Sequence, residues 1–254
     1  MGKIVAFSNQ KGGVGKTTTT VNMAAYAAAA KKRVLIVDLD PQGNASSGLG
    51  VQKNNLTKSL YDVLIGDCDA KEVVMSTSQY GLDILPSNVD LAGAQVDLVY
   101  MPERESVLKH AIEPLKPVYD FIFIDCPPSL GLLTINALTA CDSVMIPIQS
   151  EYYALEGLSQ LMNTIKIIKT KLNPSIDVEG VVLTMYDSRS ISSKQVFAEI
   201  NKFFGKKVYA VQIPRNIRLS EAPSYGKSIM EYDPRSSGGQ AYEAVTREFL
   251  SKQK

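Results

Sequence analysis

Residues Asn9–Thr19 read NQKGGVGKTTT, and this stretch joins two segments with different secondary-structure patterns. The preceding run, Lys3–Ser8 (KIVAFS), is mostly apolar and predicts a buried strand. The following run, Thr17–Ala30, is rich in alanine and lacks glycine and proline, which favours a helix. Three glycines allow the intervening loop to aim several backbone N–H groups at one place: Gly12, Gly13 and Gly15. Because a helix N-terminus adds partial positive charge there, the stretch predicts a polyphosphate-binding loop.

The side chains of this loop fit the same ligand. Lys16 can neutralise β- and γ-phosphates, and the Thr17 hydroxyl can take a coordination position on Mg²⁺. A strand, a glycine-rich turn and a helix form the context that a Walker A motif requires. We therefore expect a nucleotide with Mg²⁺ to be held by the following residues: Gly12, Gly13, Val14, Gly15, Lys16, Thr17 and Thr18.

The loop departs from the standard consensus at one position. The consensus G-x-x-x-x-G-K-[ST] has glycine where this chain has Gln10, and a second lysine, Lys11, precedes the glycine pair. The segment KGGVGKT resembles the deviant Walker A motif of the ParA/MinD family, in which the extra lysine is the signature residue. The resemblance implies that Lys11 reaches across a dimer to the partner's nucleotide and acts there as a catalytic and binding residue. A solvated loop lysine is the alternative.

Short apolar runs alternate with helical patterns along the rest of the chain. The runs that predict strands are Arg33–Asp38, Leu82–Leu85, Phe121–Asp125, Ser143–Ile148, Val178–Met185 and Lys207–Ile213. The helical patterns cover Val89–Tyr100, Glu103–Leu115, Ala154–Leu172, Ser192–Phe204 and Gly239–Ser251. Apolar strands covered by intervening helices predict an α/β fold with a mainly parallel sheet and helices on both faces. No linker or internal repeat divides the chain, so we expect a single ATPase domain over residues 1–254.

Two of the predicted strands end in carboxylates. In the segment VDLDPQGN, Asp38 ends the strand and Asp40 lies in the loop that follows, where it can orient an attacking water and contribute to the metal site. In the segment FIFIDCPPS, which resembles a Walker B element, Asp125 ends an apolar strand and is expected to hold Mg²⁺ through its water shell. Ligands collect at the carboxyl ends of parallel strands, so we expect these side chains to converge on the phosphate loop.

Composition narrows the class of protein. A hydrophobic content of 45% is ordinary for a globular protein, and no run reaches the roughly 18 apolar residues of a membrane span. The N-terminus shows no signal peptide, and the odd count of three cysteines argues against a disulfide framework, so we expect a cytoplasmic protein. The net charge is only +1, but Met1–Ser159 carries −5 and Gln160–Lys254 carries +6. This asymmetry can concentrate positive potential on one side of the molecule.

The resemblance extends over essentially the whole chain. The segments Asp40–Gly50, Ile124–Ala140, Glu151–Leu161 and Ile213–Ile229 are each similar to the chromosomal ParA/Soj proteins, which are bacterial partition ATPases. The resemblance implies an ATPase with ATP and Mg²⁺ as cofactors, which forms a homodimer when ATP is bound. It also implies binding to double-stranded DNA without sequence preference, association with the nucleoid, and stimulation of hydrolysis by a ParB-type partner.

The resemblance assigns further residues in the basic half of the chain. The segment IPRN, Ile213–Asn216, corresponds to the part of the family that packs on adenine, through Pro214, Arg215 and Asn216, with Met185 as a further candidate. Proline offers an apolar face, and asparagine can hydrogen-bond a base edge. For DNA the resemblance points to Arg189 and Arg218, which lie where a long side chain can reach a phosphate.

Two other functions share parts of this pattern. A MinD-like membrane-associated positioning ATPase also has the deviant loop but needs a C-terminal amphipathic membrane helix, and the C-terminal segment has few large apolar residues. A nitrogenase-reductase-like enzyme needs cysteines that hold an iron–sulfur cluster between subunits, and Cys126 beside the Walker B strand is a poor candidate. We therefore expect a partition ATPase that contacts DNA rather than a membrane.

Overall fold

The computed structural model describes residues 2–151 and 154–253. Part of the family-like segment Glu151–Leu161, namely its two tyrosines, lies outside the described residues.

The fold is built on one seven-stranded sheet with the strand order β3-β4-β2-β5-β1-β6-β7. The strands are β1 (Lys3–Phe7), β2 (Val34–Asp38), β3 (Met75–Ser76), β4 (Leu82–Leu85), β5 (Phe121–Asp125), β6 (Ser143–Gln149) and β7 (Asp177–Thr184). All neighbouring pairs are parallel except β3 with β4. The centre of the sheet is fully buried, which explains the near-continuous apolar strands.

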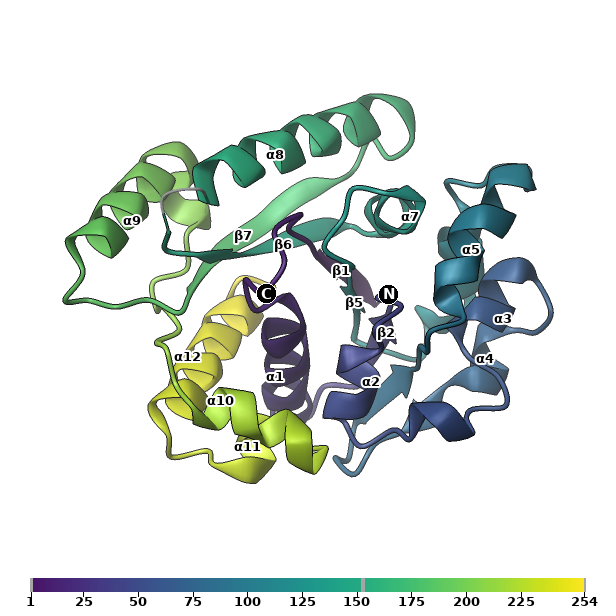
Figure 1. Ribbon diagram of the computed structural model, residues 1–254, viewed down its shortest axis with the longest axis horizontal. Helices are drawn as coiled ribbons and strands as arrows, with labels where there is room; N and C mark the ends of the chain where they lie inside the picture. Colours follow the sequence, from purple (N-terminus) through teal and green to yellow (C-terminus); the bar gives the residue numbers. More distant parts are fainter. Residues whose placement is uncertain (1, 152–153, 254) are drawn as a thin grey trace.

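Helices cover both faces of the sheet (Figure 1). The face that carries Val5 and Phe7 packs against α1 (Lys16–Ala29), α2 (Asn44–Gly48), α10 (Arg218–Glu221), α11 (Ile229–Tyr232) and α12 (Ser237–Ser251). The face that carries Ile4 and Ala6 packs against α3 (Leu60–Ile65), α4 (Ala70–Val73), α5 (Leu91–Asp97), α6 (Val107–Ile112), α7 (Leu132–Ala140), α8 (Ala154–Lys171) and α9 (Ile191–Phe204). Successive residues of a strand point to opposite faces, so each strand supplies both cores. The predicted mainly parallel α/β fold is confirmed.

One predicted strand is wrong. Residues Lys207–Ile213 form no regular strand, although the Tyr209 and Ile213 amides donate to the carbonyls of Val181 and Leu183 in β7. The two donors, Tyr209 and Ile213, are four residues apart, whereas the two acceptors in β7 are only two residues apart. This mismatch interrupts the regular β-ladder. The Tyr209 ring is fully buried over Gly180, where a Cβ on the glycine would lie 2.4 Å from the ring. The chain bends at Ala210 and Val211 between these two hydrogen bonds, so the segment pairs with β7 only at isolated residues.

Two predicted helices are shorter than their patterns. The segment Glu103–Leu115 contains α6 from Val107 onward and ends in a 3₁₀ turn, because Glu103 adopts a positive φ of 49° that no α-helix accepts. The segment Val89–Tyr100 contains α5, which tightens into a 3₁₀ turn after Asp97. The remaining predicted helices agree with α1, α8, α9 and α12 to within two residues at either end.

Candidate active site

The loop between β1 and α1 has the geometry that its glycines predict. Gly13 and Gly15 have φ values of 72° and 82°, in the left-handed region that side chains rarely enter. The buried residue between them, Val14, ties the loop to β7, because its carbonyl accepts a hydrogen bond from the Thr184 hydroxyl at 2.8 Å. Helix α1 then begins at Lys16, so its free N–H groups face the loop. The loop is therefore built as an anion cradle.

Lys16 lies inside this cradle. Its side chain is buried, and its Nζ donates to the carbonyl of Lys11 at 3.1 Å. Burial lowers the pKa of Lys16, while the carboxylates of Asp125 and Asp40 act in the opposite direction. A buried ammonium group this close to two carboxylates stays charged only with their support or with an anionic ligand. Lys16 is thus placed to bind phosphate.

Two buried carboxylates lie side by side below the loop. The ends of β2 and β5 pair so that Asp38 stands opposite Asp125, and both side chains are fully buried. Burial raises the pKa of Asp125, and the negative charge of Asp38 raises it further. Oδ1 of Asp125 accepts from the Thr20 hydroxyl at 3.2 Å, whereas Oδ2 has no hydrogen-bond partner among the described residues. An orphaned buried carboxylate oxygen beside a second carboxylate is a fitting place for a divalent cation.

The site has few carboxylate ligands. Within residues 2–151 and 154–253, no group of three or more His, Cys, Asp or Glu side chains is close enough to hold a metal ion by itself. Mg²⁺ commonly takes one or two carboxylates and completes its shell with water and substrate phosphates. The residues present therefore fit a Mg²⁺ ion that binds together with a nucleotide.

Asp40 lies at the edge of a cavity of about 290 Å³ beside the loop. The cavity is lined by Gly12, Gly13, Gly15, Lys16, Thr17, Thr18, Asp40, Gln42, Asn44, Pro128 and Met185. Oδ1 of Asp40 accepts from the Gln42 amide at 2.9 Å, which leaves Oδ2 available to a ligand. The structure thus brings together Asp40 and the predicted loop residues except Val14, whose buried side chain does not line the cavity. Asp125 is buried and does not line it either.

A second cavity, of about 300 Å³, adjoins the first at Gly15, Thr18 and Met185. Its walls include all four of the residues predicted for adenine: Met185, Pro214, Arg215 and Asn216. The Asn216 amide nitrogen donates to the Ser237 hydroxyl and its oxygen accepts from the Arg218 amide, so one N–H and one lone pair remain for a base. The phosphate cavity and the largely apolar second cavity thus adjoin, as the phosphate and base subsites of a nucleotide site would.

Lys11 points away from the phosphate cavity. It lines a separate, more open hollow with Gln10, Pro128, Ser129 and Leu130, and its Nζ forms an ion pair with Glu151 at 2.9 Å. The structure therefore does not bring Lys11 to the nucleotide site of its own subunit.

Both arginines predicted for DNA lie on the surface in ion pairs. Arg189 is 89% exposed in the loop before α9 and pairs with Asp187 at 3.2 Å. Arg218, the first residue of α10, pairs with Glu221 at 2.8 Å and with Asp233 at 3.6 Å. Exposed pairs of this kind are weak, so the arginines can exchange their carboxylates for phosphates.

Sequence reasoning missed several residues that line the two cavities. Thr184, Leu219, Pro223 and Tyr242 reach the base pocket, and Gln42, Asn44 and Pro128 reach the phosphate cavity. Gln42 and Asn44 belong to the quoted segment VDLDPQGN, so their closeness to Asp40 in the sequence could have indicated that they line the same cavity. Tyr242 arrives from α12, more than two hundred residues from the loop, and nothing in the local pattern indicates it.

Comparisons with known proteins agree on the family. A family model described as an AAA domain matches residues 2–178. The chain is 56% identical to the sporulation initiation inhibitor protein Soj of Bacillus subtilis over 248 residues, 98% of each chain. It is 52% identical to the chromosome partitioning protein ParA of Myxococcus xanthus over 252 residues, which cover 99% of this chain and 89% of that protein. The crystal structure of cobyrinic acid a,c-diamide synthase from Mycobacterium smegmatis with bound ADP and magnesium superimposes with a TM-score of 0.88 at 36% identity, covering 100% of this chain and 96% of that one.

The parallel sheet, the phosphate loop and the carboxylates at its strand ends define a P-loop ATPase. The chain belongs to the ParA/Soj family of chromosome-partitioning ATPases.

Proposed function

We propose that this ATPase is an ATP-dependent homodimer that binds DNA without sequence preference, serves chromosome or plasmid partitioning, and is stimulated by a ParB-type partner. ATP and Mg²⁺ are its cofactors. The observation that carries the proposal is that Lys16 and Asp40 line one cavity, while the buried Asp125 at the end of β5 acts electrostatically on Lys16. We further propose that residues 1–254 act as a single ATPase domain in the cytoplasm, associated with the nucleoid.

The loop and Lys16 bind and orient the polyphosphate. Backbone N–H groups of Gly12–Thr18 surround the phosphates, and the Lys16 ammonium neutralises the β and γ groups. Thr17, Asp40 and Asp125 are the side chains that would hold Mg²⁺, which would supply positive charge next to the transferred phosphoryl group. Oδ2 of Asp125 is the buried acceptor that remains for this role.

Asp40 acts on the attacking water. Its carboxylate lies at the cavity edge opposite the loop, on a chain segment whose main chain is fixed by hydrogen bonds. A carboxylate there orients water in line with the γ-phosphate, and positioning dominates this chemistry. The base would be held in the second cavity, which Pro214 and Met185 line, and where Asn216 offers one donor and one acceptor.

Lys11 serves the partner's nucleotide in this proposal. Its own phosphate cavity excludes it, and its side chain is held on the outer surface by Glu151. A cation in that place completes a site only when a second copy approaches, which makes dimerisation depend on ATP. The dimer then doubles the phosphate contacts that Arg189 and Arg218 offer to DNA.

A MinD-like membrane role is disfavoured by the last helix. No helix in the described part of the chain is long and apolar enough to cross a membrane. Val245 and Phe249 of α12 are fully buried against the sheet, Leu250 is partly buried against the same core, and Phe249 packs on Phe121 at a ring distance of 5.2 Å. An apolar face that is already buried in the fold is not available for a membrane surface.

The test compares sedimentation with plasmid DNA and with liposomes, each with ATP and Mg²⁺. We expect the protein to sediment with DNA and not with liposomes. The double variant Arg189→Glu with Arg218→Glu should bind DNA far more weakly while it still binds ATP. If each arginine meets one phosphate, the dimer derives about four contacts from them, a salt slope near −3.6.

The control variant is Lys58→Glu with Lys71→Glu. It makes the same charge change at two residues that are also ion-paired, on the α3–α4 side of the molecule. We expect the control to bind DNA much better than the arginine variant. Equal loss in both variants would show that only net charge matters, and binding to liposomes by the parent would favour the membrane role.

A further inference from the structure

Asp38 has a structural task that the proposed chemistry does not use. It is fully buried at the end of β2, and its Oδ2 accepts two hydrogen bonds from Ser46, one from the amide and one from the hydroxyl, each at 2.7 Å. Ser46 belongs to the short helix α2, which follows the loop that carries Asp40. Asp38 therefore attaches α2 to the carboxyl end of β2.

A second buried serine connects this anchor to Asp40. The amide of Ser87, just after β4, donates to the Ser46 hydroxyl at 3.0 Å. The Ser87 hydroxyl donates to the main-chain carbonyl of Asp40 at 2.8 Å. Ser46 and Ser87 are both fully buried, so these bonds do not compete with water.

The bonds form a closed circuit through Asp38, Ser46, Ser87 and Asp40, and the Ser87 hydroxyl also lies 3.4 Å from the Asn88 carbonyl oxygen. The Ser46 hydroxyl donates a hydrogen bond to the Asp38 carboxylate and accepts one from the Ser87 amide. The Ser87 hydroxyl in turn donates to the Asp40 carbonyl. The Asp40 amide also faces Oδ1 of Asp38 at 3.4 Å. Three separate segments, the end of β2, helix α2 and the end of β4, are thereby held around the residue that carries the hydrolytic carboxylate.

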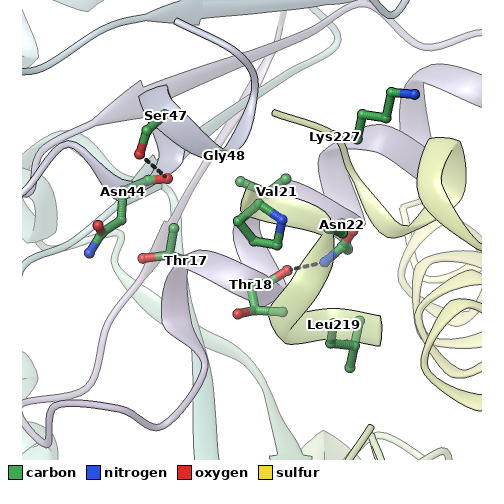
Figure 2. A pocket seen from close by; sticks show the side chains of 11 residues that line it. Thr17, Thr18, Val21, Asn22, Asn44, Ser47, Gly48, Leu219 and Lys227 are labelled. Atoms are coloured by element: carbon green, nitrogen blue, oxygen red, sulfur yellow. Dashed lines mark hydrogen bonds between the residues drawn. The ribbon is translucent and has the colours of Figure 1, made fainter. Parts of the chain in front are cut away.

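The opposite side of α2 borders a cavity. Asn44, Ser47 and Gly48 line this cavity of about 260 Å³ between α2, the first turns of α1 and the segment around Leu219, which Figure 2 shows. The inner side of α2 is held by the Ser46 hydrogen bonds and by the buried side chains of Ala45 and Leu49. The hydrogen bonds are the polar contacts that fix α2 relative to the Asp40 loop.

We propose that Ser46 and Ser87 are positioning residues for ATP hydrolysis, which hold Asp40 in its reactive place through the buried Asp38 carboxylate. The inference rests on the proposed role of Asp40. Neither serine lines the phosphate cavity, so neither is expected to contribute to ATP binding. A displacement of about 1 Å in a catalytic group can reduce the rate by about a hundredfold, and a looser Asp40 should show a smaller part of this effect.

The experiment measures kcat and KM for ATP in Ser46→Ala, Ser87→Ala and the double variant. We expect kcat to fall about tenfold or more in each single variant with KM nearly unchanged, and the double variant to lose less than the product of the two. Ser59→Ala is the matched control, because Ser59 is also a buried serine but belongs to the N-terminus of α3. It should keep the parent kcat.

The Asp40→Ala background separates the possible failures. If Asp40→Ala hydrolyses ATP normally, the proposed function fails at its catalytic residue. If Asp40→Ala is inactive but both serine variants keep the parent kcat, the positioning role is overturned. Should Ser87→Ala fail to fold by circular dichroism, Ser46→Ala carries the same comparison.

Discussion

Lys11 Nζ lies 2.9 Å from Oε2 of Glu151, and this ion pair holds the signature lysine at the surface of the single subunit. The side chains of Lys11 and Glu151 are 35% and 51% exposed, so the pair is weak. If Lys11 must leave Glu151 to reach a partner's nucleotide, this bond opposes dimerisation by a small amount.

Glu151→Gln should therefore strengthen the ATP-dependent dimer. An exposed ion pair contributes about 0–1 kcal/mol and a symmetric dimer breaks two of them, so the dimer dissociation constant should fall by at most about thirtyfold. Sedimentation equilibrium with ATP, in an Asp40→Ala background that blocks turnover, measures the constant. A clearly weaker dimer would instead assign Glu151 to the interface itself.

Gly12→Val should give a folded, ATP-binding monomer. A Cβ at Gly12 would meet nothing closer than Pro128 at 3.8 Å, and Gly12 is not among the glycines with positive φ, so the subunit accepts the side chain. The added branched group stands on the face where two phosphate loops are expected to meet. Light scattering with ATP distinguishes the states, and a stable dimer would contradict the proposed interface.

Lys16→Ala should abolish useful ATP affinity. Loss of one partner from a buried charged contact costs about 2–5 kcal/mol, and no other cation lines the phosphate cavity within the described residues. Calorimetric titration with ATP and Mg²⁺ measures the effect. Lys11→Ala is the control, because Lys11 lies outside that cavity and should still allow ATP binding.

Glu179→Gln should reduce stability in a pH-dependent way. Burial alone would raise the pKa of Glu179, but hydrogen bonds from Lys3, Ser143 and Gln253 outweigh it and hold the pKa below its usual value. Because the folded-state pKa is lowered, the charged form stabilises the fold above the unfolded-state value of about 4.3, and this contribution is lost as pH falls through the folded-state pKa.

Urea unfolding near neutral pH should therefore show the variant to be less stable by about 1–3 kcal/mol. The difference between parent and variant should shrink when the pH is well below the ordinary glutamate pKa. An equal difference at both pH values would mean that shape, rather than charge, determines the loss.

The sequence predicted those parts of the fold and site that depend on contiguous residues. Gly12–Thr18, Asp40 and Asp125 lie in short motifs at strand ends, so the parallel sheet brings them to one edge. Ser87 and Tyr242 come from distant segments through tertiary packing, which no local pattern encodes.

Several short helices lie outside the predicted ranges, and α7 (LLTINALTA) shows why. It is buried on nearly all sides, so it lacks the polar face that marks a helix in a sequence. The segment Lys207–Ile213 has a strand-like composition, but it bends at Ala210 and Val211 and pairs with β7 only at isolated residues.

We propose that ATP, before its hydrolysis, creates the DNA-binding dimer. The decisive measurement is sedimentation velocity of Asp40→Ala with Mg²⁺ and either ATP or ADP, with and without a short DNA duplex of arbitrary sequence. We expect a dimer that binds the duplex with ATP, and a monomer that leaves the duplex free with ADP. A monomer with ATP, or equal DNA binding with the two nucleotides, would overturn the proposal.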